Sequence, residues 1–202
     1  MDLPDRLALY LEVVSVLFAL AYLKLAIRQS QWCWPVALVW VALGAIVYFD
    51  AKLYMESALQ IFYVAMAIYG WVLWRRGAGD GPGVRVHWWR ARTHILAVTA
   101  IVIASVGFGW VMSRTDAAFP YVDSFTTVAA IVTTFMVARK VIENWIYWLV
   151  IDSILVYVNL ARELYWYAAL YAYFLILVVL GFHAWWKSLN AEGHVADGRS
   201  PT

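Results

Sequence analysis

The sequence is poor in charge. Asp, Glu, Lys and Arg make up only 14% of its 202 residues, whereas 65% are hydrophobic and the mean hydropathy is +0.72. So few charged side chains cannot give a soluble domain of this size a polar surface. Apolar runs long enough to cross about 30 Å of hydrocarbon recur along nearly the whole chain. We therefore expect an all-α integral membrane protein, with one transmembrane domain over residues 1–188 and a tail over 189–202.

Cysteine is almost absent. The single Cys33 excludes an intrachain disulfide and a C-x-x-C metal site. The four histidines, His87, His94, His183 and His194, form no metal-ligand pattern with it. We therefore expect no metal and no cofactor.

The motifs of membrane enzymes and photoreceptors are also missing. The chain has no G-x-S-x-G, H-E-x-x-H or paired-aspartate protease motif. A retinal protein needs a lysine buried in a span, and the last apolar segment has only Lys187, at its end. The formal net charge of +2 gives no reason to expect nucleic acid as a partner. These absences argue against an enzyme and leave a solute transporter or a non-transporting membrane receptor.

Charges and clusters of Pro or Gly divide the chain into apolar segments. The opening MDLPDRLALYLEVV has two aspartates and no basic n-region, so it is expected to be a retained helix rather than a signal peptide. The clearest loop, residues 75–92, contains Pro82, four glycines and five arginines. The pattern predicts seven transmembrane helices, over residues 7–27, 34–49, 53–74, 93–112, 123–141, 144–160 and 163–187.

Lys and Arg are unevenly distributed between the two ends of these helices, with eleven on one side and four on the other. Because cytoplasmic loops carry the excess of basic residues, we expect the N-terminus outside and the C-terminal tail in the cytoplasm of a plasma (inner) membrane. The eleven are Lys24, Arg28, Arg75, Arg76, Arg85, Arg90, Arg92, Arg139, Lys140, Lys187 and Arg199, and the four are Arg6, Lys52, Arg114 and Arg162.

The chain contains an internal repeat. A shift of 111 residues aligns identical residues without a gap. It maps repeat one, residues 7–76, onto repeat two, residues 122–187, and leaves the segment 93–112 as a linker helix between them. This 3+1+3 plan predicts a parallel repeat, which in transporters binds solute between the halves. The identities include Arg28 with Arg139, Trp34 with Trp145, Leu38 with Leu149, Tyr54 with Tyr165, Gly70 with Gly181, and Trp74 with Trp185.

Asp152 is the deepest ionisable residue in a predicted span. A charge there costs at least about 2.5 kcal/mol on insertion scales, so it is a functional-site candidate by default. In the stretch ENWIYWLVID, residues 143–152, the residues Trp145, Trp148 and Asp152 are spaced i, i+3 and i+7 and share one stripe of a helix. Indoles stack on flat rings and attract cations, and a carboxylate answers a positive charge. The stripe fits a small, planar, cationic or amino-bearing solute. Trp145 also lies near enough to a helix end to be an interface-belt residue instead.

The same stripe has polar neighbours. Asn159 continues it, seven residues after Asp152. Glu143 and Asn144 lie at the predicted cytoplasmic start of the helix, where polar residues cost little, and Asn144 is kept as a candidate binding residue.

Candidates also occur in two other spans. Asp123 opens the segment 123–141, where it is a natural N-cap. Thr127 belongs to a group of threonines that either lines a solute path or bonds back to its own helix. Gln60 and Tyr63 give the segment 53–74 a polar face, expected to point into the bundle.

The stretch ARKVIENWIYWLVID, with PYVDS before it and ALQ…IYGW in the segment 53–74, resembles the PnuC family of vitamin transporters. The resemblance covers essentially the whole chain. It implies a SWEET-like 3+1+3 fold and a homotrimer in the lipid bilayer. It also implies facilitated diffusion of a vitamin, which phosphorylation then traps in the cytoplasm.

One position separates branches of this family. Members that carry nicotinamide riboside resemble W-x-x-W-x-x-x-N, whereas this chain has Asp152 in the last position and is more similar to the thiamine-carrying PnuT branch. Both vitamins are cationic, so charge alone does not decide between them. Thiamine also has an aminopyrimidine that can pair with a carboxyl group, whereas ribose hydroxyls suit an asparagine. We predict thiamine, with nicotinamide riboside as the alternative.

Overall fold

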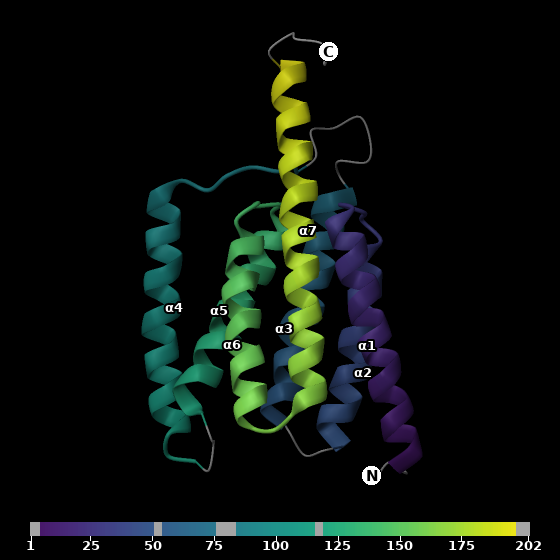
Figure 1. The fold of residues 1–202 in the computed structure, drawn as a ribbon, viewed down its shortest axis with the longest axis vertical. Helices are drawn as coiled ribbons and strands as arrows, with labels where there is room; N and C mark the ends of the chain where they lie inside the picture. The colour runs from purple at the N-terminus through teal and green to yellow at the C-terminus, as the bar shows by residue number, and fades with distance from the viewer. Residues whose placement is uncertain (1–4, 51–53, 76–83, 116–118, 197–202) are drawn as a thin grey trace. The chain divides into compact units, whose positions relative to one another are not determined.

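The computed structural model describes residues 5–50, 54–75, 84–115 and 119–196 (Figure 1). These residues form seven α-helices, and the chain divides into two compact units, residues 1–84 and 85–202. The helices are α1 (Asp5–Ile27), α2 (Cys33–Asp50), α3 (Tyr54–Arg75), α4 (Ala91–Met112), α5 (Pro120–Ala138), α6 (Asn144–Ala161) and α7 (Tyr165–Ala196). We call α1–α3 the first triplet and α5–α7 the second triplet.

The predicted helices are confirmed, and most of their ends lie within two or three residues of the prediction. Two ends differ. Asp123 is not the N-cap of α5, because the helix starts three residues earlier, with Phe119 as N-cap and Pro120 in the first turn. Proline suits that place, since its fixed φ matches a helix and its missing N–H is not needed there. Helix α7 runs beyond Lys187 to Ala196; Leu189, Ala191 and Glu192 in this extension favour a helix, whereas Gly193 does not.

In the first triplet, α2 packs against both α1 and α3. Small residues such as Ala26 and Ala67 let these helices approach closely, and the indole of Trp34 is buried between them. Each of the three residues is 2% exposed or less. Lys52, Arg76 and Arg199, used above for the topology, lie outside the described residues, as do the side chains of Arg6 and His194.

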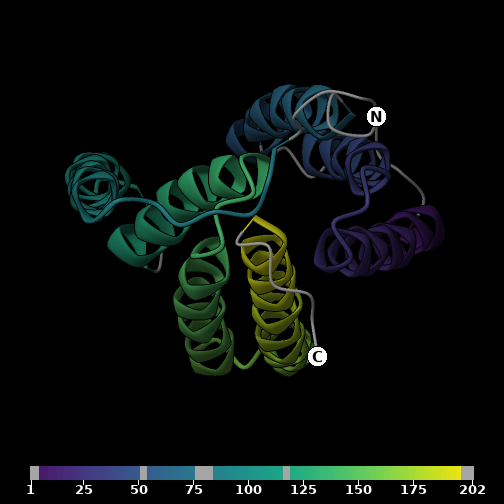
Figure 2. The ribbon, with the colours of Figure 1, turned by 90° about the horizontal axis from the view of Figure 1, so that it is seen from above.

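In the second unit, α6 packs against both α5 and α7, and α4 packs on α5 (Figure 2). The linker helix is therefore the outermost helix of this unit. It buries few of its residues, among them Ile101, Ser105 and Gly109. The rest of α4 exposes large apolar side chains such as Ile103, which is 68% exposed. Such a surface is suited to lipid.

The turns that enter α2 and α6 have the same backbone geometry. Gln29 and Lys140, which are 111 residues apart, have φ of 54° and 53°. The Ser30 N–H donates to the Leu25 carbonyl at 2.9 Å, and the Val141 N–H donates to the Met136 carbonyl at 2.9 Å. Helices α1 and α5 are thus both followed by a residue in the left-handed region and by a hydrogen bond back across the last helical turn. The two turns are equivalent in the register that the sequence repeat predicts.

A tryptophan–glycine contact is also repeated. Trp34 packs edge-on against Trp74 at 5.4 Å, and Trp145 packs edge-on against Trp185 at 5.4 Å. A methyl group added to Gly70 would overlap the ring of Trp34, and one added to Gly181 would overlap the ring of Trp145. Each triplet therefore joins its second and third helices by an indole seated on a glycine, so the internal repeat is present in the packing within the two triplets as well as in the sequence.

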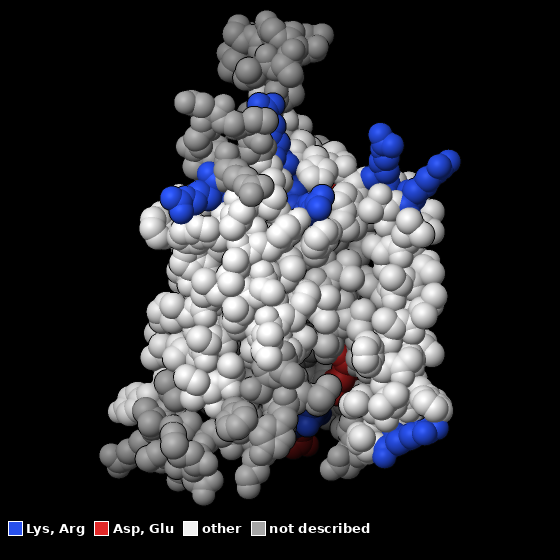
Figure 3. Space-filling model, turned by 180° about the vertical axis from the view of Figure 1, so that it is seen from behind, with Lys and Arg blue, Asp and Glu red and all other residues white. Residues whose placement is uncertain are grey.

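The helices match a bilayer in length and polarity. Among the described residues, α4, α5, α6 and residues 165–191 of α7 are long and apolar enough to cross a membrane, and the first triplet has shorter apolar stretches over 13–27, 33–46 and 59–75. On the face seen in Figure 3, Lys and Arg side chains gather near the ends of the helices, with almost no charge between them. The protein is a polytopic membrane protein.

Candidate functional site

Asp152 lies in the middle of α6 and is 4% exposed. Among the residues that the structure describes, none forms a hydrogen bond or an ion pair with its carboxyl group. An ionised carboxylate buried without a partner is costly, so such groups are found where a solute or another charge meets them. Asp152 therefore remains a candidate binding residue, and its role stays a prediction.

Trp148 lies one turn before Asp152 and is half-buried. Its ring packs against a buried cluster of Ile101 from α4, Ala129 from α5 and Ile151 from α6. Three helices thus support one side of the indole and leave part of it accessible. The ring is held in place and can still receive a flat ligand.

Trp145 is more buried within the protein than Trp148. It is 2% exposed and its ring is enclosed by Trp185 and Gly181 of α7. This burial excludes the interface-belt alternative for Trp145. Its indole Nε1 has no hydrogen-bond partner among the described residues. The structure gives Trp145 a packing role that is shared with Trp34, and a stacking role for it stays a prediction.

Asn159 and Thr127 differ in which side-chain groups are left to bind a ligand. The Asn159 Nδ2 donates to the Leu155 carbonyl of its own helix at 2.7 Å, which leaves the side-chain oxygen as the group for a ligand. Thr127 is exposed on α5. The neighbouring threonines bond back to their helix, as Thr133 does to the Ala129 carbonyl at 2.7 Å. Of the threonines on α5, Thr127 is thus the one kept as a candidate.

Asp123 is half-buried in the first turn of α5, at the opposite end of the second triplet from Asn144. Its carboxylate is near enough to the Arg162 guanidinium for an electrostatic interaction. A substrate-binding role for Asp123 stays a prediction. In the first triplet, Gln60 and Tyr63 are half-buried on α3, and their contribution to a site likewise stays a prediction.

The start of α6 is more buried than the sequence suggested. Glu143 is 7% exposed and Asn144 is fully buried, although polar residues at a helix start were expected to be solvated. The Asn144 Nδ2 donates to the Val141 carbonyl at 2.7 Å, while its Oδ1 has no partner among the described residues. The expectation failed because residues 85–90, which the sequence placed in a loop, cover this helix start. Glu143 also pairs with His94, which lies 49 positions earlier, and no local pattern in the sequence predicts this contact.

The described residues contain no group of three or more His, Cys, Asp or Glu side chains that could hold a metal ion. The candidate side chains described above offer an indole, a buried carboxylate and amide or hydroxyl groups.

Comparison with known proteins shows the family to which this chain is similar. Residues 9–187 match the family described as Nicotinamide mononucleotide transporter. The riboflavin/roseoflavin transporter RibM of Streptomyces davaonensis is 30% identical over 201 residues, which cover 96% of this chain and 93% of RibM. The nicotinamide riboside transporter PnuC of Escherichia coli strain K12 is 25% identical over 210 residues, which cover 91% of this chain and 88% of PnuC.

A solved structure has the same fold. The crystal structure of the vitamin B3 transporter PnuC matches with a TM-score of 0.73 and 21% sequence identity, over 90% of this chain and 83% of that one. The family match covers nearly the whole membrane domain, and the resemblance read from the ENWIYWLVID stretch is confirmed. The chain therefore belongs to the nicotinamide mononucleotide transporter family, the family of PnuC, and is a multi-pass membrane transporter.

Proposed function

We propose that this protein carries a small planar B-vitamin across the membrane, and that the vitamin is thiamine. The observation that carries the proposal is Asp152, a carboxylate that is 4% exposed and has no partner among the described residues. A cationic solute supplies the missing charge, and its flat ring fits beside the supported indole of Trp148.

Thiamine matches this pair of groups at both of its rings. Its thiazolium ring is a permanent cation, which favours an indole face and a nearby carboxylate. Its aminopyrimidine presents an amine beside a ring nitrogen, and a carboxyl group can bond both at once. The Asn159 oxygen lies on the same stripe of α6 and is proposed to accept a further hydrogen bond.

Riboflavin is the second candidate, because the relative RibM, named as a riboflavin/roseoflavin transporter, is 30% identical to this chain. Riboflavin is neutral, so Asp152 would accept hydrogen bonds from its ring N–H or ribityl hydroxyls rather than balance a charge. Nicotinamide riboside, named for PnuC, is the third. It is cationic, and its hydroxyls suit an amide better than a carboxylate.

The proposed transport is facilitated diffusion. No coupling ion is required by the groups described above, and phosphorylation of the vitamin in the cytoplasm would make the net flux inward. We further propose a homotrimer in the plasma (inner) membrane, with the N-terminus outside.

Counterflow in proteoliposomes tests the substrate. Vesicles loaded with unlabelled thiamine, riboflavin or nicotinamide riboside are placed in a trace of the same labelled vitamin, with protein-free vesicles as the control. We expect labelled thiamine to accumulate transiently and the other two to exchange more slowly. Exchange of riboflavin or nicotinamide riboside without exchange of thiamine would reject thiamine. Binding of a vitamin without any exchange would show a receptor instead of a transporter.

A further inference from the structure

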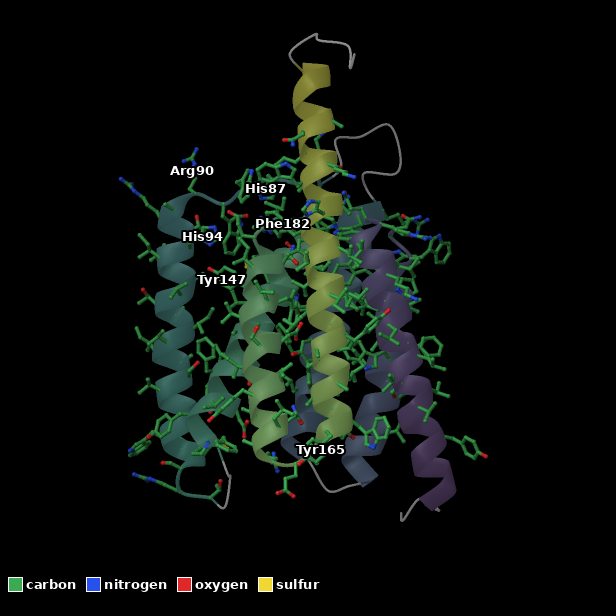
Figure 4. All side chains as sticks on the ribbon, in the orientation of Figure 1. His87, Arg90, His94, Tyr147, Tyr165 and Phe182 are labelled. Carbon is green, nitrogen blue, oxygen red and sulfur yellow. The ribbon has the colours of Figure 1, made fainter. Side chains whose placement is uncertain are left out.

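Glu143 is the N-cap of α6 and lies outside the proposed vitamin site; among the residues whose burial the structure describes, it and Asp152 are the buried carboxylates. Its Oε1 accepts a hydrogen bond from the Trp89 backbone N–H at 3.1 Å and faces the His94 Nε2 at 2.8 Å. The His94 Nδ1 lies 3.0 Å from the Tyr147 hydroxyl (Figure 4). Since a carboxylate only accepts, Nε2 carries the hydrogen, and in the neutral imidazole Nδ1 accepts from Tyr147. We call Glu143, His94, Tyr147 and the Trp89 N–H the clamp.

The clamp holds a segment that runs across the second unit. Residues 85–90, here called the strap, pair with the turn between α5 and α6: the His87 N–H donates to the Lys140 carbonyl at 3.2 Å, and the Ile142 N–H donates to the His87 carbonyl at 3.0 Å. Trp88 packs edge-on against Trp186 of α7 at 5.6 Å. The strap thus contacts the turn into α6 and also α7, and it leads directly into α4.

The internal repeat shows that this clamp is not needed to build the turn. The turn into α2 has the same backbone bonds and the same left-handed residue, yet the positions of Glu143 and Tyr147 are occupied there by Trp32 and Val36. Withdrawing a carboxylate from water costs several kcal/mol before its bonds are counted. Because the fold forms this turn without the cost in one triplet, the clamp in the other is expected to have a role beyond the turn.

The clamp is connected to the proposed site through α6 and α4. Tyr147 is the residue before Trp148, and both rings pack against the buried cluster that contains Ile101 of α4. Helix α4 is therefore fastened to α6 at two levels, by polar bonds at the helix start and by apolar packing beside Trp148. We propose that Glu143 and His94 are positioning residues, which fix the first turns of α6 against α4 and so set the orientation of Trp148 and Asp152 toward the vitamin.

This inference rests on the proposed function for the site, but its first test needs no vitamin. His94→Phe keeps a ring between Trp89 and Tyr147 and removes both hydrogen bonds, and Glu143→Ala removes the acceptor. In hydrogen–deuterium exchange of the purified full-length protein, we expect both variants to speed exchange of the amides over residues 144–152 and 86–94. The equivalent turn, residues 28–36, should be unchanged. Unchanged exchange over 144–152 in both variants would overturn the proposed positioning role of the clamp.

The second test separates positioning from stability. In proteoliposomes, we expect both variants to raise the half-saturation concentration for the vitamin about tenfold, as for loss of a charge-assisted hydrogen bond. The maximal rate per folded protein should stay near that of the wild type. Glu143→Gln keeps an acceptor oxygen and should recover most of the affinity. Ile95→Ala, next to His94 and 65% exposed, is the matched control and should behave as the wild type.

The outcomes distinguish the two proposals. Wild-type protein that carries none of the three vitamins overturns the proposed function, and the positioning role falls with it. Wild-type transport with unchanged half-saturation in both variants overturns the positioning role alone, even if the variants unfold at lower temperature.

Discussion

At the scale of single residues, Asp152 is the group on which the proposed substrate depends. Asp152→Asn keeps the size and the hydrogen-bonding oxygen but removes the charge, so a cationic vitamin loses its counter-ion. We expect the half-saturation concentration for thiamine to rise at least about tenfold, which corresponds to about 1.4 kcal/mol, and uptake of nicotinamide riboside to increase. Ser153→Ala is the matched control, because Ser153 is exposed and bonds to its own helix at the Leu149 carbonyl. Thiamine kinetics that do not change in Asp152→Asn would remove this residue from the site.

Substitutions of the two tryptophans of α6 are expected to have different effects. Trp148→Leu keeps an apolar side chain against the cluster but removes the stacking face, so we expect about a three- to tenfold weaker affinity with little change in the unfolding temperature. Trp145→Phe leaves a gap beside Trp185 and Gly181, so it should lower the unfolding temperature. Titration of vitamin binding and thermal unfolding in detergent separate these effects. Equal losses of affinity in both variants at unchanged stability would restore Trp145 as a ligand residue.

At the scale of helices, each triplet joins its second and third helices by an indole that lies on a glycine. Gly181→Ala would place a methyl group within the ring of Trp145, and we expect it to destabilise the protein by about 1–3 kcal/mol, as overpacking of a core does. Gly107→Ala on α4 is the control, because nothing lies within 4 Å of its added methyl group and alanine favours a helix. Thermal unfolding in detergent measures both. A neutral Gly181→Ala would mean that α6 and α7 separate easily.

The helices could be read from the sequence because each is an apolar run bounded by charge, Pro or Gly. The 111-residue repeat was equally accessible, since Trp34, Gly70 and Trp74 recur as Trp145, Gly181 and Trp185, and the packing explains why these identities are shared. The burial of Glu143 could not be predicted from the sequence, because it depends on contacts with the strap, whose residues are distant in sequence. Periodicity alone also placed Trp145 and Trp148 on one stripe without showing that α7 encloses the first of them.

At the scale of the whole molecule, the distribution of Lys and Arg predicts the orientation in the membrane. Cys33 is fully buried, so the wild type offers little background for thiol labelling. We expect a membrane-impermeant maleimide to label Ser113→Cys in intact cells and to label Lys187→Cys only after lysis, since both positions are exposed and lie at ends assigned to opposite sides. The reverse pattern would place the N-terminus in the cytoplasm.

The proposed facilitated diffusion also concerns the whole molecule, because it requires that no coupling ion moves with the vitamin. In proteoliposomes containing only this protein, we expect labelled thiamine to reach the same concentration inside and outside, with or without an imposed proton gradient. A thiamine kinase and ATP enclosed in the vesicles should then raise the total label inside above the external concentration, since we expect the phosphorylated product not to be carried. Vesicles with the kinase but no ATP are the control. Accumulation of unmodified thiamine that follows the proton gradient would contradict facilitated diffusion, and Asp152, the buried carboxylate of α6, would then be the first candidate for the proton carrier.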